Sequence, residues 1–240
     1  MRYTMPFRVR YSETDETGHV NLHKLLDYFQ DSSIFHSESL GYTVQKELEI
    51  NRGWFLLAWN LEVNRFPTMG EELKVVTEPY KMRGFYGYRR YILMDQEDHV
   101  LASADSLWIL MNLSTFTPIR VPQDMTDAYI SGVTDDKIRV KRKLDVTGEW
   151  VKRDEILIDH HYVDSNSHVN NAYYAMWAED MLPDGFHIKK VMIDYRQSAF
   201  EKDTIIIETI EEKGKIRCRF TKENDMLLAL VELYSEDFEE

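Results

Sequence analysis

Apolar residues in this chain follow two spacings, one typical of a helix and one typical of strands. A helical spacing begins after Asn21, a residue that favours helix caps, and stops at Gly41, a residue type common just past helix ends. Its apolar positions share one helix face, namely Leu22, Leu25, Leu26 and Phe29. The first half therefore predicts one long helix followed by antiparallel strands, in the runs 54–66, 71–80, 86–95 and 100–113.

The same order of elements returns in the second half of the chain. A strand-like run near 150–163 leads to a shorter helical pattern at 171–182, which Pro183 ends. Residues 59–73 also align without gaps on residues 191–205, so the two halves are similar to each other. One helix for several antiparallel strands predicts an α+β fold, in which two tandem halves form an intrachain pseudo-dimer. The later strand-like runs are 188–197, 203–212, 216–222 and 227–236.

A polar, charged segment between the halves, from about 114 to 149, reads as a connector laid over the surface and not as a third domain. We expect an N-terminal half at 1–128, a linker at 129–149 and a C-terminal half at 150–240. The tandem already supplies a pseudo-dimer, and the sequence leaves open whether two chains also pair as a homodimer.

The net charge of −13 argues against nucleic acid or an anionic membrane as a partner. An acidic partner would need a local basic patch, and KIRVKRK at 137–143 is the clearest one, with weaker ones around Arg89–Arg90 and Lys189–Lys190. No apolar run reaches the length of a membrane span, and the first residues alternate like a strand and not like a signal peptide. A single cysteine, Cys218, suits a reducing compartment, so we expect a cytoplasmic protein.

One short motif occurs twice, as DETGHVN at 15–21 and DSNSHVN at 164–170, each time just before a helix. The first backbone N–H groups of a helix lack intrahelical acceptors, so those of Val169 and Asn170 could bind an oxyanion. In an extended segment Asp164, Asn166 and His168 would face one side. A carboxylate, an amide and an imidazole together suit the hydrolysis of an activated acyl group.

The first copy has no asparagine between its aspartate and its histidine, which leaves Asp15 and His19 as the only functional pair. Aspartate is also a favoured residue just before a helix, so a purely structural role explains this copy equally well.

The second motif with its helix, DSNSHVNNAYYAMWAED, resembles the signature of the acyl-ACP thioesterase family. The resemblance extends over the whole chain, including TPIRVP at 117–122 and DYRQSAFEKD at 194–203. It implies a double hotdog fold, without a cofactor, that hydrolyses the thioester between a fatty acyl chain and acyl carrier protein in fatty acid biosynthesis. Carried over by position, it implies that Asp164, Asn166 and His168 are catalytic, and that the first half shapes the acyl pocket.

One position departs from the family pattern. The family commonly has a glutamate, sometimes followed by a cysteine, where this chain has Ser198 and Ala199. A cysteine nucleophile is excluded there, whereas Ser198 could orient water or substrate. Glu201 lies nearby but would point to the opposite face from Ser198, and Cys218 is expected to pack within a strand.

Other functions remain alternatives at this point. The first copy resembles the 4-hydroxybenzoyl-CoA thioesterase type of hotdog enzyme, in which Asp15 would be the active carboxylate on an acyl-CoA. A non-catalytic module that binds acyl chains is a further alternative. A metal site is not expected, because His160 and His161 would point to opposite faces of a strand and the spacing to His168 matches no metal motif.

Overall fold

The structure, a computed structural model, describes residues 1–132, 137–140, 142–164 and 168–238. The chain divides into two compact units, the first formed by residues 1–57 and 64–140 and the second by residues 58–63 and 141–240. The predicted boundaries at 128/129 and 149/150 stay a prediction, because the division into two units does not mark the ends of the predicted linker.

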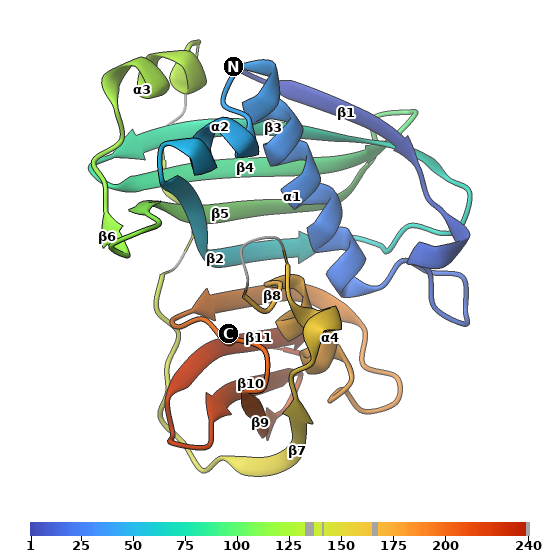
Figure 1. The fold of residues 1–240 in the computed structure, drawn as a ribbon. Coiled ribbons are helices and arrows are strands. Elements are labelled where there is room, and N and C mark those ends of the chain that lie inside the picture. Colours follow the sequence, from blue (N-terminus) through green and yellow to red (C-terminus); the bar gives the residue numbers. More distant parts are fainter. Residues whose placement is uncertain (133–136, 141, 165–167, 239–240) are drawn as a thin grey trace. The chain divides into compact units, whose positions relative to one another are not determined.

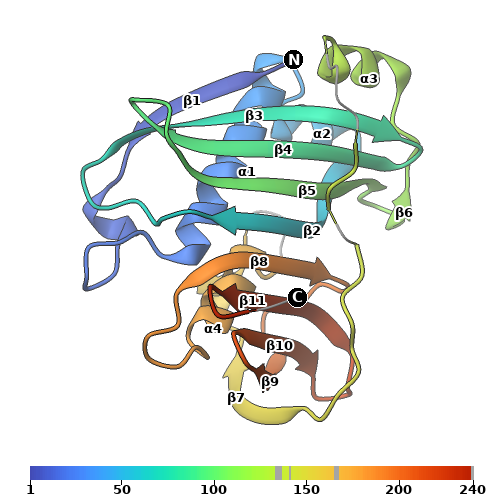
Figure 2. The ribbon, with the colours of Figure 1, turned by 180° about the vertical axis from the view of Figure 1, so that it is seen from behind.

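The first unit is an antiparallel sheet with a long helix on one face (Figure 1). Its strand order is β1-β3-β4-β5-β2, and the reverse view in Figure 2 shows the strands in front of helix α1. A short helix, α2, precedes β2, and a second, α3, follows the short β6, which pairs with β5. The elements are β1 (Tyr3–Arg8), α1 (Leu22–Ser39), α2 (Val44–Glu49), β2 (Arg52–Val63), β3 (Glu72–Arg83), β4 (Tyr86–Asp95), β5 (Val100–Asn112), β6 (Thr117–Pro118) and α3 (Gln123–Ile130).

Helix α1 begins after Asn21 and ends before Gly41, as the sequence predicts. Its apolar face is buried against the sheet, with Leu22, Leu25 and Phe29 fully inaccessible to solvent. The Phe29 ring lies 5.2 Å from the ring of Tyr91 on β4. Burying one such side chain contributes about 2 kcal/mol to stability. The apolar face therefore contributes several times this amount to holding the helix on the sheet.

The second unit repeats the plan with a shorter helix. Its strand order is β8-β11-β10-β9-β7, and residues 58–62 of β2 pair with β8. Helix α4 packs on β11, and its Tyr174 ring lies 5.3 Å from the ring of Phe220 on the neighbouring strand β10. Cys218 is buried in β10, as expected, and burial raises the pKa of its thiol to about 12. The elements are β7 (Val151–Leu157), α4 (Ala172–Glu179), β8 (Ile188–Tyr195), β9 (Thr204–Glu212), β10 (Lys215–Lys222) and β11 (Leu227–Ser235).

The segment predicted to be a surface connector is more ordered than the sequence suggests. It contains α3, and its later part is bound to the second unit. The N–H of Leu144 donates to Asp194 Oδ2 at 3.1 Å, and Arg217 Nη1 donates to Thr147 O at 3.0 Å. Alternating apolar residues explain this, because Leu144 is buried while its neighbours Lys143 and Asp145 are exposed.

Within the described residues, none of the helices combines the length and the apolar composition that crossing a bilayer requires.

Candidate active site

The described residues of the second motif, Asp164 and 168–170, come directly before α4 in the chain. The Asp164 N–H donates to the carbonyl of His168 at 2.9 Å, and Val163 and Val169 form an antiparallel bridge. The Val169 N–H donates to Ala199 O at 2.9 Å, which ties the loop to the segment after β8. These backbone bonds bring Asp164 and His168 to the two ends of one loop.

The side chains of Asp164 and His168 are both partly buried. Burial lowers the pKa of His168, and the negative charge of Asp164 partly opposes this by raising it. The imidazole is therefore neutral at pH 7 and can accept a proton, while the nearby carboxylate favours the protonated form once it appears. Asn166, the third residue of the predicted set, lies outside the described residues.

The two backbone donors expected for an oxyanion are both occupied. Val169 N–H donates to Ala199 O, and Asn170 N–H donates to Tyr162 O, each at 2.9 Å. The prediction that the Val169 and Asn170 N–H groups bind an oxyanion is therefore corrected. The sequence pattern shows no acceptor for them, but in the structure they donate to backbone carbonyls. Instead, Asn170 caps the helix through its side chain, whose Oδ1 accepts the Ala172 N–H at 3.0 Å.

In the first motif the Asp15 N–H likewise donates to the carbonyl of His19, and the Asp15 carboxylate accepts hydrogen bonds from its own loop. Asp15 Oδ1 accepts the N–H of Thr17 at 2.8 Å, its Oγ1–H at 2.7 Å and the N–H of His19 at 3.0 Å. Burial alone would raise the pKa of Asp15, but the hydrogen bonds from Thr17 and His19 outweigh it and lower the pKa. Both Asp15 and His19 are exposed. The carboxylate is thus engaged in holding its own loop.

The accessory candidates lie in the turn between β8 and β9. Ser198 is partly buried and precedes Ala199, whose carbonyl accepts the Val169 N–H, so Ser198 lies beside the second motif loop. Glu201 is exposed. The same turn brings a residue that the motif search missed. The ring of Phe200 lies 5.0 Å from the imidazole of His168. The alignment of 59–73 on 191–205 could have pointed to it, since Phe200 falls on Thr68.

The expected opposite orientation of His160 and His161 is wrong. Strand β7 ends at Leu157, and the two histidines lie in a 3₁₀ turn with ring centroids 3.9 Å apart. A 3₁₀ turn does not alternate as a strand does, which explains the difference. Even so, the part of the chain that the structure describes contains no group of three or more His, Cys, Asp or Glu side chains placed to hold a metal ion.

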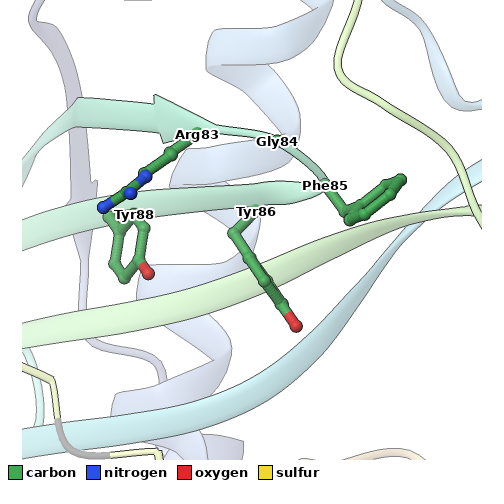
Figure 3. Close-up of a pocket in the computed structure, with 5 residues that line it drawn as sticks. All are labelled: Arg83, Gly84, Phe85, Tyr86 and Tyr88. Atoms are coloured by element: carbon green, nitrogen blue, oxygen red, sulfur yellow. The ribbon is translucent and has the colours of Figure 1, made fainter.

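A surface hollow lies elsewhere, at the turn between β3 and β4 (Figure 3). It is at the opposite end of β3 from the first motif, about 40 Å away along a twelve-residue strand. None of the predicted site residues lines it, and its lining consists of Arg83, Gly84, Phe85, Tyr86 and Tyr88.

The basic segments differ in their exposure. In 137–143, Lys137, Arg139, Arg142 and Lys143 are exposed, and Lys141 lies outside the described residues. The weaker patch around Arg89–Arg90 is corrected, because Arg89 is only 6% exposed and donates to Thr77 Oγ1 inside the first unit. At the third segment, Lys189 forms an ion pair with Glu236 and Lys190 lies over the ring of Tyr234.

Comparison with known proteins identifies the family to which this sequence is similar. A model of the acyl-ACP thioesterase N-terminal domain matches residues 1–129, and a model of the C-terminal domain matches residues 149–232. The dodecanoyl-acyl-carrier-protein hydrolase of Umbellularia californica is 25% identical over 219 residues, which are 83% of this chain and 56% of the plant protein. The chain spans about half the length of the curated relatives it matches.

Solved structures match the chain over nearly its whole length. An acyl-ACP thioesterase from Bacteroides thetaiotaomicron matches with a TM-score of 0.88 at 20% identity, covering 98% of both chains. The 12:0-ACP thioesterase from Umbellularia californica matches with a TM-score of 0.81 at 19% identity, covering 97% of this chain and 96% of the other. At this level of identity the matches establish the fold, and they confirm the predicted α+β double hotdog.

Proposed function

Because the chain belongs to the acyl-ACP thioesterase family, we propose that it hydrolyses the thioester of a fatty acyl chain on acyl carrier protein. The observation that carries this proposal is the second motif loop, which holds a partly buried, neutral His168 beside the carboxylate of Asp164. Hydrolysis of a thioester needs a base for water, and this pair supplies one.

In the proposed reaction, a water molecule attacks the thioester carbonyl carbon while the His168 imidazole takes one of its protons. The tetrahedral intermediate then breaks its C–S bond, and the imidazolium returns the proton to the leaving thiolate. The products are a free fatty acid and the carrier protein with its thiol. Asp164 stabilises the imidazolium by its charge, as the direction of its effect on the pKa of His168 supports.

Asn166 is proposed to donate its side-chain amide to the carbonyl oxygen as negative charge develops there. The N–H groups of Val169 and Asn170 already donate to Ala199 O and Tyr162 O, so a side-chain donor is the simplest source of this stabilisation. Ser198, which lies beside the loop, is proposed to help orient the water or the substrate.

A substrate panel tests the function. Purified protein is assayed for thiol release from acyl-ACP and acyl-CoA over a range of chain lengths, and we expect kcat/KM to be larger for acyl-ACP. Preference for acyl-CoA would support the acyl-CoA alternative instead. Binding of both substrates without thiol release would refute hydrolysis and support an acyl-binding module.

The exposed basic residues of 137–143 are proposed to dock the acidic carrier protein. Charge reversal of Arg142 and Lys143 together should raise KM for acyl-ACP and leave KM for acyl-CoA unchanged, and added salt should raise KM in the same selective way. A double variant whose KM for acyl-ACP equals that of the wild type would rule out this segment as the docking patch.

A further inference from the structure

Phe200 is a half-exposed aromatic side chain that lies against the proposed base. It sits in the turn between β8 and β9, is 45% exposed, and its ring is tilted by 49° to the imidazole of His168 at a centroid distance of 5.0 Å. A half-exposed phenylalanine gains only part of the stabilisation of a fully buried one. Contacts other than core packing therefore also contribute to holding this ring in place.

Both the backbone and the ring of Phe200 are held by one ion pair. The N–H of Phe200 donates to Asp203 Oδ2 at 2.7 Å, and the N–H of Asp203 donates back to Phe200 O at 3.1 Å. Asp203 pairs with Lys222 on β10, where Nζ and Oδ2 are 2.6 Å apart. The same Nζ lies 5.2 Å from the centroid of the Phe200 ring, within cation–π range. The ring therefore lies close to both a cation and the imidazole of His168.

The first unit contains the same turn without a ring. There Thr68 N–H donates to Glu71 Oε1 at 2.8 Å, and Glu71 pairs with Arg65. The side chain at the position of Phe200 is a threonine hydroxyl, which also donates to Glu71 Oε1. Thr68 forms a backbone bridge with His19, as Phe200 contacts His168 in the second unit. In both units, therefore, the turn contacts the histidine of the motif. The aromatic cover is what the second unit adds.

We propose that Phe200 is a positioning residue for His168, holding the imidazole in one orientation and keeping water from one of its faces. The ring acts through the histidine and takes no part in bond making. This inference rests on the proposed function, since it assumes that His168 is the base. The charged groups around the imidazole are Asp164 on its own loop and the Asp203–Lys222 pair behind the ring.

The ring should leave a mark on the titration of His168. Its removal exposes the imidazole to water, and because burial lowers the pKa of His168, exposure raises it. A base must be neutral to act, so the acidic limb of the kcat/KM profile moves to higher pH. We also expect kcat to fall about tenfold, since a mispositioned base works poorly.

The experiment compares Phe200→Leu with Phe200→Tyr, which keeps a ring, and with Phe85→Leu as a matched control. Phe85 is 39% exposed and lies at the β3–β4 turn of the first unit, where it lines the surface hollow (Figure 3). For each variant, NMR titration of the His168 ring protons gives its pKa, and thiol release from acyl-ACP gives kcat/KM against pH. Melting temperatures report whether each variant folds.

The expected result is an upward shift of the His168 pKa and of the acidic limb in Phe200→Leu, with wild-type values in the other two variants. Unchanged titration and unchanged kcat in Phe200→Leu would overturn the inference. If Phe200→Leu does not fold, Lys222→Met serves in its place, because it removes the cation that holds the ring, and its failure to shift the titration counts equally against the inference. Full activity of His168→Ala would instead overturn the proposed function. The NMR titration of His168 in the Phe200 variants would still show whether Phe200 shields the imidazole.

Discussion

The two motif loops share one backbone arrangement and differ in their side chains. In each loop the aspartate N–H donates to the carbonyl of the histidine four residues later, at 2.8 Å in the first and 2.9 Å in the second. In each, the valine N–H then donates to a carbonyl in the turn after the first strand beyond the helix, Pro67 O or Ala199 O. The common part is therefore a structural frame that presents a histidine at a helix start.

The side chains on this frame point to different roles. Asp15 accepts three hydrogen bonds from its own loop, and both it and His19 are exposed. In the second loop Asp164 and His168 are partly buried, and an aromatic ring covers the histidine. A duplicated motif is thus no evidence of a duplicated activity, because the environment of its charged groups decides what they can do.

The largest expected effect separates the two histidines. His168→Ala should lower kcat for acyl-ACP on the order of 10²-fold or more, because it removes the base, whereas His19→Ala should leave kcat within about twofold. Thiol-release kinetics on both purified variants provide the measurement. If His19→Ala proved the more damaging change, the active loop would be the first one.

The second effect concerns stability and belongs to the first loop. Asp15→Asn should lower the free energy of unfolding by about 1 kcal/mol at pH 7, since the carboxylate accepts three hydrogen bonds there. The pKa of Asp15 is depressed in the folded state, so this contribution is present above its unfolded pKa and disappears as pH falls through the folded pKa. Urea unfolding should show the variant and wild type converging in acid.

A third effect is a change in the pH profile. Asp164 raises the pKa of His168, so Asp164→Asn should lower that pKa and move the acidic limb of kcat/KM to lower pH. Asp15→Asn is the matched control and should leave the limb in place. Movement of the limb to higher pH in Asp164→Asn would contradict the assigned direction of the interaction.

The smallest effect tests one backbone position in the shared turn. Lys202 has a φ of 74°, in the left-handed region, and the residue that aligns with it is Gly70, with a φ of 85°. Left-handed backbone is costly for a residue with a Cβ, so Lys202→Gly should stabilise the second unit by about 0.5 kcal/mol. Gly70→Lys should destabilise the first unit, and thermal unfolding of both variants should show opposite signs.

Much of the fold could be predicted because its signals are local. The face formed by Leu22, Leu25 and Phe29 and the stop at Gly41 gave α1 within about two residues. Helix α3 was missed because its eight residues lie in a polar segment without strong periodicity. The sequence predicts a strand near 150–163, whereas β7 ends at Leu157 and His160–Tyr162 form a 3₁₀ turn, whose N-cap Asp159 accepts the His161 N–H.

The site was predicted in part for the same reason. The positions of Asp164 and His168 follow from a contiguous motif, whereas the occupation of the Val169 and Asn170 N–H groups depends on Ala199 and Tyr162, which the motif does not include. Arg89 likewise does not form the predicted basic surface patch, because its strand position faces the core.

The sequence by itself determined that both halves contain the same loop before a helix. Its signals are helix caps, apolar spacing and turn residues, which act on neighbours along the chain. Only the tertiary structure decided which histidine is covered. Phe200 reaches His168 from a separate turn, and Lys222 reaches Phe200 from another strand. Such contacts arise from strand pairing between distant segments, which is why the difference between the loops becomes visible only in the folded chain.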